Sequence, residues 1–298
     1  MDGCGSRLLP STSEDPAADA GRPPLPAGQL VDLPGRGELF VRQAGERRPN
    51  RPSLVLLHGW TATADLNWFP AYAPLAERAH VVACDLRGHG RGLRSPQRFS
   101  LEDCADDIAA VAVELDLHRI VPVGYSMGGL VAQLLWQRHR PTVGGLILCS
   151  TSRNFRGTAG DQVFFNGLSR LAGIGRLAPG PLRDQAFARL VELRTAALGL
   201  APWAMEEVAG HDVCALLEAG AAIGEFSSSE WIGEVDVPTA VVVTTADTTV
   251  PTDRQRKLAA AIPEAMTLDV DADHLACPRR PERFIPALLD AVDHVLGG

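Results

Sequence analysis

One serine in this 298-residue chain lies in a segment whose glycine spacing suits a nucleophile. Residues 124–128 read Gly-Tyr-Ser-Met-Gly, after an apolar run and before an amphipathic one. In such a strand-to-helix turn the serine takes a strained backbone conformation, and the glycines leave room because they lack a Cβ. The turn raises the Ser126 hydroxyl above the sheet edge, at a helix N-terminus that stabilises developing negative charge. Ser126 is therefore the candidate nucleophile.

A serine hydroxyl is a weak nucleophile, so it needs a base beside it and an acid that orients the base. His274 is the candidate base, because it follows a short apolar segment and precedes the terminal helical pattern. Asp247 is the candidate acid, in the loop after the apolar run 240–244. The chain order serine, aspartate, histidine agrees with these roles. Three other aspartates compete for the acid role: Asp253, Asp271 and Asp273.

The tetrahedral intermediate of acyl transfer needs N–H donors for its oxyanion. The backbone N–H of Met127, next after the candidate nucleophile, is one predicted donor. Residues 57–60 read Leu-His-Gly-Trp after another apolar run, and the Trp60 N–H is the second. Aromatic side chains are candidates for substrate contacts, although those beyond residue 150 can equally pack among themselves. They are Tyr125, Phe164, Trp203 and Trp231.

Short apolar runs separated by helical patterns must position these residues. The runs lack polar alternation, which is typical of strands buried on both faces of a parallel sheet. Between two of them, Ser100 can cap a helix whose first turn carries Glu102 and Asp103. Alternating strands and helices predict an α/β fold with a doubly wound, mostly parallel sheet. The predicted strands include 54–57, 81–83, 120–123, 145–148 and 240–243.

Composition and pattern divide the chain into three parts. Residues 1–26 are rich in Pro, Gly, Ala, Ser and Asp, which predicts a flexible tail. Residues 27–150 and 236–298 carry the strand and helix alternation and predict the core. Residues 151–235 read as helix after helix, which predicts a helical cap inserted into that core.

Taken together, these motifs resemble those of the α/β-hydrolase superfamily, in particular esterase-like and lipase-like serine hydrolases with a helical cap. The resemblance covers about residues 29–296 and implies a Ser-His-Asp triad on that fold. One departure is Arg91-Gly92, where the family often has a serine, and another is Asp273, where it often has glycine before the histidine. The motifs are 58–60 (His-Gly-Trp), 85–90 (Asp-Leu-Arg-Gly-His-Gly), 124–129, Asp247 with Val250-Pro251, and His274.

The resemblance also bears on the choice of acid. An alternative acid position in this superfamily follows the strand that ends near Cys149. Residues 150–154 read Ser-Thr-Ser-Arg-Asn there, without a carboxylate, which favours Asp247.

The resemblance implies hydrolysis, and we expect a carboxylic ester with a moderately hydrophobic acyl or alcohol part, cleaved through an acyl-enzyme. Relatives with this triad also cleave C–C bonds, lactones, thioesters, amides or N-terminal proline peptides, or act as perhydrolases. A further alternative is a non-catalytic small-molecule receptor on the same scaffold. Ser126 at the elbow disfavours the branches with an aspartate nucleophile, such as epoxide hydrolases.

Composition argues against several other classes. The formal net charge is -8 and basic residues are scattered, so we expect no nucleic-acid partner. The glycine spacing at 124–129 fails the dinucleotide fingerprint, and no metal triad or phosphate loop is visible, so we expect no cofactor or metal. No apolar run reaches the roughly 18 residues of a membrane span. We expect a cytoplasmic protein with a small-molecule substrate; the oligomeric state stays open.

Two charged features have ordinary explanations at this level. The basic cluster of Arg87, Arg91, Arg94 and Arg98 is expected in a solvated loop rather than at an anionic ligand. Asp65 is expected to be a turn carboxylate rather than a residue that shapes the oxyanion loop.

Overall fold

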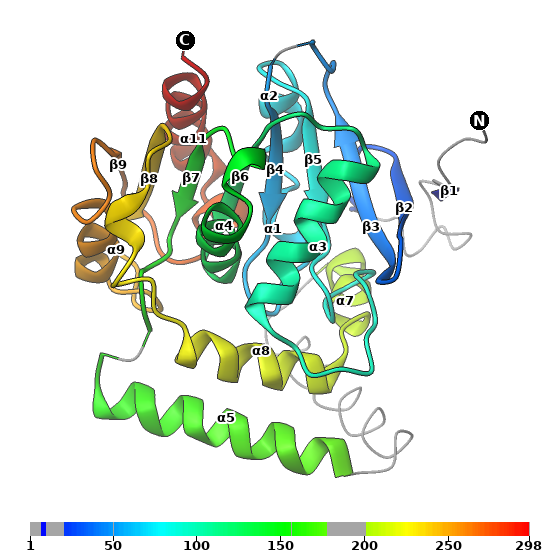
Figure 1. The fold of residues 1–298 in the computed structure, drawn as a ribbon, viewed down its shortest axis with the longest axis vertical. Helices are drawn as coiled ribbons and strands as arrows, with labels where there is room; N and C mark the ends of the chain where they lie inside the picture. The colour runs from blue at the N-terminus through cyan, green and yellow to red at the C-terminus, as the bar shows by residue number, and fades with distance from the viewer. Residues whose placement is uncertain (1–6, 10–20, 50, 156, 178–200, 298) are drawn as a thin grey trace.

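The computed structural model describes residues 7–9, 21–49, 51–155, 157–177 and 201–297. In these residues a nine-stranded sheet has the order β1-β2-β3-β5-β4-β6-β7-β8-β9 (Figure 1). The first three strands pair antiparallel, as does β3 with β5, and the strands from β4 onward pair parallel. The strands are β1 (Arg7–Leu9), β2 (Gly28–Leu33), β3 (Gly37–Ala44), β4 (Ser53–Leu57), β5 (Val81–Cys84), β6 (Ile120–Tyr125), β7 (Leu146–Cys149), β8 (Thr239–Thr244) and β9 (Met266–Val270).

The predicted α/β fold with a mostly parallel sheet is confirmed. The five apolar runs form β4 to β8, and every residue of these strands is buried. Successive side chains enter opposite layers, as the period of two requires. Leu54 and Leu56 of β4 pack in one apolar cluster, whereas Val55 and Leu57 pack in the other.

Helices cover both faces of the sheet. Burial of each large apolar side chain in the two layers stabilises the fold by about 1.5–3 kcal/mol. One layer contains α3 (Leu101–Glu114), α4 (Met127–Arg138) and α9 (Thr252–Ala259). The other contains α1 (Ala64–Trp68), α2 (Tyr72–Ala76), α10 (Ala276–Arg279) and α11 (Pro281–Leu296).

Helix α3 begins where the sequence predicts. The Ser100 hydroxyl accepts the Asp103 N–H at 3.0 Å, and Glu102 and Asp103 lie in the first turn. Helix α4 follows Ser126 directly and ends at Arg138, shortly before Pro141 in a single 3₁₀ turn (Arg140–Thr142).

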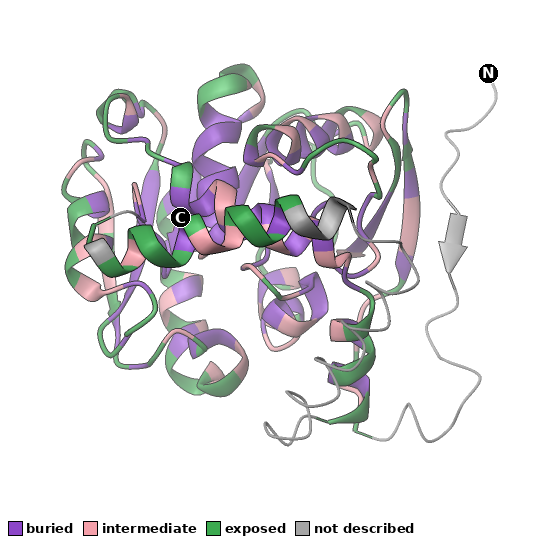
Figure 2. Ribbon diagram, turned by 90° about the horizontal axis from the view of Figure 1, so that it is seen from below, coloured by how far each residue is buried: buried purple, intermediate pink, exposed green. Residues whose placement is uncertain are grey.

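Between β7 and β8 the described chain is helical. It contains α5 (Ala159–Leu177), α7 (Pro202–Ala209), α8 (Val213–Glu225) and a 3₁₀ turn (Ile232–Glu234). Helices α5 and α8 run side by side across one end of the sheet in Figure 1. Seen from below in Figure 2, α5 is the outer of the two, and Val163, Phe164 and Leu171 are exposed on it. We retain as a proposal that 151–235 is a cap on a core of 27–150 and 236–298.

The segment predicted as a flexible tail makes contacts where the structure describes it. Arg7–Leu9 pair with β2. This pairing satisfies N–H and C=O groups that the edge of β2 would otherwise leave unpaired. Arg22 donates to Glu206 at 2.6 Å. The remainder of that prediction, residues 1–6 and 10–20, lies outside the described residues. Among the described helices, none combines the length and apolarity of a membrane span.

Candidate active site

Ser126 occupies a strained turn between β6 and α4. Its φ of 53° and ψ of −115° lie outside the regions that residues with a side chain usually adopt. Two hydrogen bonds hold this conformation. The Ser126 N–H donates to the Cys149 carbonyl at 3.0 Å, and the Thr151 hydroxyl donates to the Ser126 carbonyl at 2.7 Å.

The flanking glycines are required by close backbone approach. A Cβ on Gly124 would lie 2.3 Å from the Gly128 carbonyl oxygen. A Cβ on Gly128 would lie 2.2 Å from the Leu57 carbonyl oxygen, on the neighbouring strand β4. Both contacts are with backbone, which cannot move aside as a side chain can. The G-x-S-x-G pattern is therefore explained by packing as well as by conformational freedom.

The structure brings the three predicted triad residues into one hydrogen-bonded row. His274 Nε2 lies 3.0 Å from the Ser126 hydroxyl oxygen, and His274 Nδ1 lies 2.7 Å from Asp247 Oδ2. The residues follow β6, β8 and β9, and the carboxyl ends of parallel strands meet at one edge of the sheet. Transfer of a proton from serine to an oriented imidazole requires this arrangement.

Asp247 is held in a single orientation toward the imidazole. Its side chain is buried, and Oδ1 accepts the N–H groups of Thr249 and Val250 at 2.8 and 2.9 Å. The Thr244 hydroxyl donates to Oδ2 at 2.8 Å. These donors leave Oδ2 directed at His274 Nδ1.

The competing aspartates make other contacts. Asp273 is exposed, and its Oδ1 accepts the Leu275 N–H at 2.9 Å. Asp271 pairs with Arg283 at 2.7 Å, and Asp253 pairs with Lys257 at 3.0 Å. The carboxylate that bonds to His274 in the described chain is that of Asp247.

Tyr125, predicted to contact substrate, hydrogen-bonds to the backbone of the histidine. Its hydroxyl donates to the His274 backbone carbonyl at 2.9 Å. Its buried ring packs edge-on against Trp68, with 5.8 Å between centroids. Tyr125 therefore fixes the loop that carries the imidazole.

The two predicted cap tryptophans pack on neighbouring aromatic rings. Trp231 stacks on Trp136 of α4 at 6.2 Å, and Trp203 packs edge-on against Phe69 at 5.5 Å. Neither of these two ring contacts involves a triad residue. Phe164, by contrast, is 53% exposed, and its ring meets that of Trp60 at 6.4 Å.

The loop after β4 runs directly beside the serine. A Cβ on Gly59 would lie 3.4 Å from the Ser126 Cβ, and the Gly59 N–H donates to Asn67 at 3.0 Å. Trp60 follows in this loop. Met127 is the first residue of α4, so its N–H is one of those that a helix leaves without an intrahelical partner. Of the two predicted oxyanion donors, Met127 is next to the nucleophile in the chain, and Trp60 belongs to the loop that lies beside it.

His58 supports this loop, a role that the sequence did not assign from residue type alone. The ring is fully buried; Nδ1 bonds to the Gly59 carbonyl at 2.8 Å, and Nε2 accepts the Leu86 N–H at 2.9 Å. Burial lowers the pKa of His58, which keeps the ring neutral. A neutral ring with its proton on Nδ1 makes both bonds.

Two further buried histidines lie next to His58. The rings of His58 and His89 are 5.2 Å apart, and those of His89 and His211 are 5.4 Å apart. Burial lowers the pKa of His89 and His211 as well, the latter to about 4. Among the described residues, no group of such side chains is arranged to hold a metal ion.

The prediction for Asp65 as a simple turn carboxylate is wrong. Asp65 is fully buried and accepts two bonds from Arg42, at 2.7 and 2.8 Å, one from Arg91 at 2.9 Å and one from Tyr72 at 3.0 Å. Burial raises its pKa, but the guanidinium groups of Arg42 and Arg91 outweigh burial and hold the pKa below its usual value. The carboxylate needs these partners because an unpaired buried charge is costly.

The prediction that the basic cluster lies in a solvated loop is also wrong for two of its members. Arg87 is buried and donates twice to Asp107, each bond 2.7 Å long. Arg91 bonds to the buried carboxylates of Asp65 and Asp85 at 2.9 and 3.1 Å. These arginines neutralise carboxylates of the core. Arg94 and Arg98 are exposed, as predicted.

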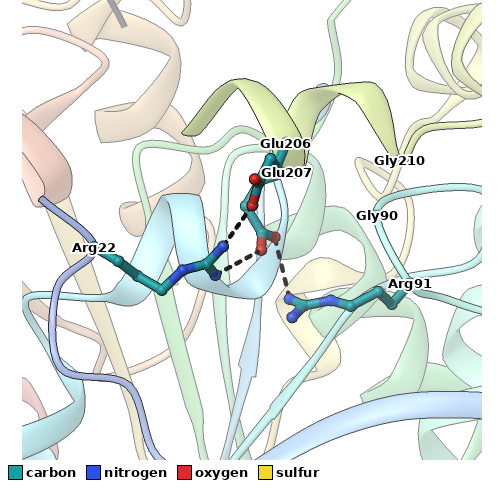
Figure 3. A pocket seen from close by; sticks show the side chains of 6 residues that line it. All are labelled: Arg22, Gly90, Arg91, Glu206, Glu207 and Gly210. Carbon is teal, nitrogen blue, oxygen red and sulfur yellow. Dashed lines mark hydrogen bonds and ion pairs between the residues drawn. The ribbon is translucent and has the colours of Figure 1, made fainter. Parts of the chain in front are cut away.

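Arg91 also connects the core to helix α7. The Arg91 guanidinium and the Thr63 hydroxyl donate to Glu207 at 3.1 and 2.8 Å. Figure 3 shows Glu207 between Arg91 and Arg22, in a pocket of about 250 Å³ that is separate from the Ser126 site. Burial raises the pKa of Glu207 to about 7.

Glu207→Gln should therefore change how stability depends on pH. Glu207 has a raised pKa, so its contribution to stability is present below pH 4.5, the ordinary pKa of a glutamate side chain, and is lost as pH rises through about 7. A neutral glutamine has no such loss. We expect the variant to gain roughly 3 kcal/mol in unfolding free energy over wild type between pH 4.5 and 8.

Urea unfolding at several pH values measures this difference. Glu206→Gln is the matched control, because that neighbouring side chain is 46% exposed and bonds to Arg22 alone in the described structure. Parallel curves for wild type and Glu207→Gln would contradict the prediction.

Comparison with known proteins identifies the family. The sequence profile of the alpha/beta hydrolase family matches residues 54–287. The chain belongs to this family. A pimeloyl-[acyl-carrier protein] methyl ester esterase of Chromobacterium violaceum is 30% identical over 270 residues, covering 86% of this chain and 98% of the esterase.

Other relatives match over shorter segments. A non-heme haloperoxidase of Rhodococcus erythropolis is 36% identical over 93 residues, which cover 31% of this chain and 32% of the haloperoxidase. The match likewise covers less than half of two further curated relatives. It spans 28% of an acetyltransferase component of an acetoin cleaving system from Pseudomonas putida and 46% of an AB hydrolase superfamily protein from Bacillus subtilis.

Solved structures agree in fold. An enol-lactonase of Burkholderia xenovorans has a TM-score of 0.71 and 24% identity, over 88% of this chain and 99% of the lactonase. A thermophilic esterase of Thermogutta terrifontis has a TM-score of 0.71 and 23% identity, over 90% of this chain and 98% of the esterase.

Proposed function

We propose that the protein is a serine hydrolase that cleaves small-molecule carboxylic esters through an acyl-enzyme. The observation that carries the proposal is the row of hydrogen bonds from Ser126 through His274 to Asp247. The full-length similarity to a methyl ester esterase supports the same bond type.

In the proposed reaction, the Ser126 hydroxyl oxygen attacks the ester carbonyl carbon while His274 Nε2 takes its proton. The Asp247 carboxylate accepts the hydrogen bond from His274 Nδ1–H and stabilises the imidazolium. The N–H groups of Met127 and Trp60 bind the oxyanion. Collapse of the intermediate expels the alcohol, which takes the proton from His274. Water then attacks the acyl-enzyme with His274 as base, releasing the acid and restoring Ser126.

Two exposed apolar side chains, one next to His274 in the chain and one beside the Trp60 ring, support a moderately hydrophobic substrate. Leu275, next to the proposed base, is 42% exposed, and Phe164 is 53% exposed beside Trp60. Apolar groups exposed at a catalytic site bind the hydrocarbon part of a ligand, while a few polar groups fix its orientation.

A series of p-nitrophenyl esters from acetate to palmitate tests the proposal. We expect turnover with an optimum at one chain length, and covalent labelling by a fluorophosphonate that peptide mapping assigns to Ser126. Labelling without ester turnover would indicate another scissile bond, such as a lactone, thioester, amide or C–C bond. A folded protein that shows neither labelling nor turnover would overturn the proposal in favour of a receptor.

A further inference from the structure

The side chain of Trp60 leaves the loop beside Ser126 and enters the cap. Its indole N–H donates to the backbone carbonyl of Leu216 in α8 at 2.9 Å. Its six-membered ring lies against Gly220, one turn further along the same helix. A Cβ on Gly220 would lie 2.7 Å from Trp60 Cζ2 and 3.1 Å from Cη2. The absence of a side chain at 220 thus makes room for the indole.

The next residue of the loop is also held by the cap. His211, between α7 and α8, bonds through Nε2 to the Thr61 carbonyl at 3.3 Å, and its Nδ1 accepts the Gly90 N–H at 2.9 Å. Thr61 has a φ of 62°, a conformation that costs energy for a residue with a branched side chain. Two consecutive loop residues are therefore tied to the segment that carries α8.

We propose that α8 positions the oxyanion donor through the Trp60 side chain. The proposal rests on the proposed function, because the donor is the backbone N–H of the same Trp60. A shift of α8 moves the indole, and the contacts of the indole with Leu216 and Gly220 restrict its rotation, so the shift also moves the backbone of Trp60, whose N–H is the proposed donor. Trp60 is in this respect a positioning residue, and the cap acts on the rate of the chemical step.

Two glycine variants on one helix separate this role from general packing. Gly220→Ala places a methyl group 2.7 Å from the Trp60 ring and 2.5 Å from Leu168 of α5. Gly224→Ala, one turn further, places a methyl group 2.4 Å from Phe165 of α5, and its three nearest atoms all belong to Phe165. Both changes raise helix propensity equally and both crowd α5.

We expect Gly220→Ala to lower kcat for p-nitrophenyl acetate on the order of 10-fold to 100-fold, with KM little changed. Gly224→Ala should keep kcat close to wild type. Trp60→Phe removes the indole N–H and the ring that meets position 220, and we expect a comparable loss of kcat. Trp136→Phe is its control, because that indole donates to Asp236 at 3.2 Å away from the loop.

The double variant tests the route of the effect. If Gly220→Ala acts through the indole, it should add little to the loss in Trp60→Phe, since residues that act through one contact are not additive. Hydrogen exchange of residues 58–63 gives a readout that needs no activity. We expect faster exchange of this segment in Gly220→Ala than in Gly224→Ala.

The two levels of the proposal fail differently. A wild type without turnover or labelling overturns the proposed function, and the exchange experiment still decides whether α8 holds the loop. The coupling is overturned if residues 58–63 exchange at the same rate in the two glycine variants. It is also overturned if the wild type is active and both Gly220→Ala and Trp60→Phe have the same kcat as the wild type. Additive losses in the double variant would also overturn it.

Discussion

Replacement of Ser126 by alanine is expected to lower kcat for p-nitrophenyl esters by about a million-fold, the loss seen when a triad serine is removed. The hydroxyl oxygen forms the acyl bond, and it lies 3.0 Å from the base that removes its proton. The strained backbone is held by Cys149 and Thr151, so the fold should survive the change. Circular dichroism and the melting temperature should match wild type.

Ser100→Ala provides the matched control for this experiment. The Ser100 hydroxyl caps α3 by accepting the Asp103 N–H. Its loss should cost about 1 kcal/mol of stability and leave kcat unchanged. If Ser126→Ala kept ester turnover comparable to wild type, Ser126 would not be the nucleophile.

The second large effect is expected for Asp247→Asn, with kcat lower by about 10⁴-fold. Asparagine fits the same space and can keep the bonds from the N–H groups of Thr249 and Val250. An amide carries no charge to stabilise the imidazolium, and it no longer fixes the His274 tautomer that the reaction needs. The loss should therefore be in kcat rather than in folding.

Asp273→Asn tests the competing acid in the same assay. Its carboxylate faces the Leu275 N–H and is exposed, so we expect kcat within a few-fold of wild type. Equal losses in the two variants, or a larger loss in Asp273→Asn, would assign the acid role differently. The choice between the two aspartates then rests on one kinetic comparison.

The central strands and the position of the serine turn could be predicted because their signals are local. A fully buried strand is a continuous apolar run, and the elbow is five consecutive residues. Strands β2, β3 and β9 are partly exposed, and their mixed polar and apolar patterns do not distinguish them from loops. Pro122 also lies within β6, in register with Val55, although proline has no N–H to donate to a sheet ladder.

The buried polar contacts could not be predicted because they join distant parts of the chain. Arg91 and Glu207 are 116 positions apart, and His58 and Leu86 are 28 apart. Charge has no periodicity that distinguishes a buried ion pair from a solvated side chain. Buried carboxylates such as Asp65 are recognised only once the partners that neutralise them are placed.

The strained conformation at position 126 does not depend on the serine side chain. The serine side chain makes no capping bond in α4, and the turn is set by backbone contacts at Gly124, Gly128 and Leu57. Exchange of the reactive side chain therefore leaves the scaffold intact, whereas a methyl group at either glycine collides with backbone. Over evolutionary time, a new nucleophile is one substitution away, but a new location for it would require a rebuilt sheet edge.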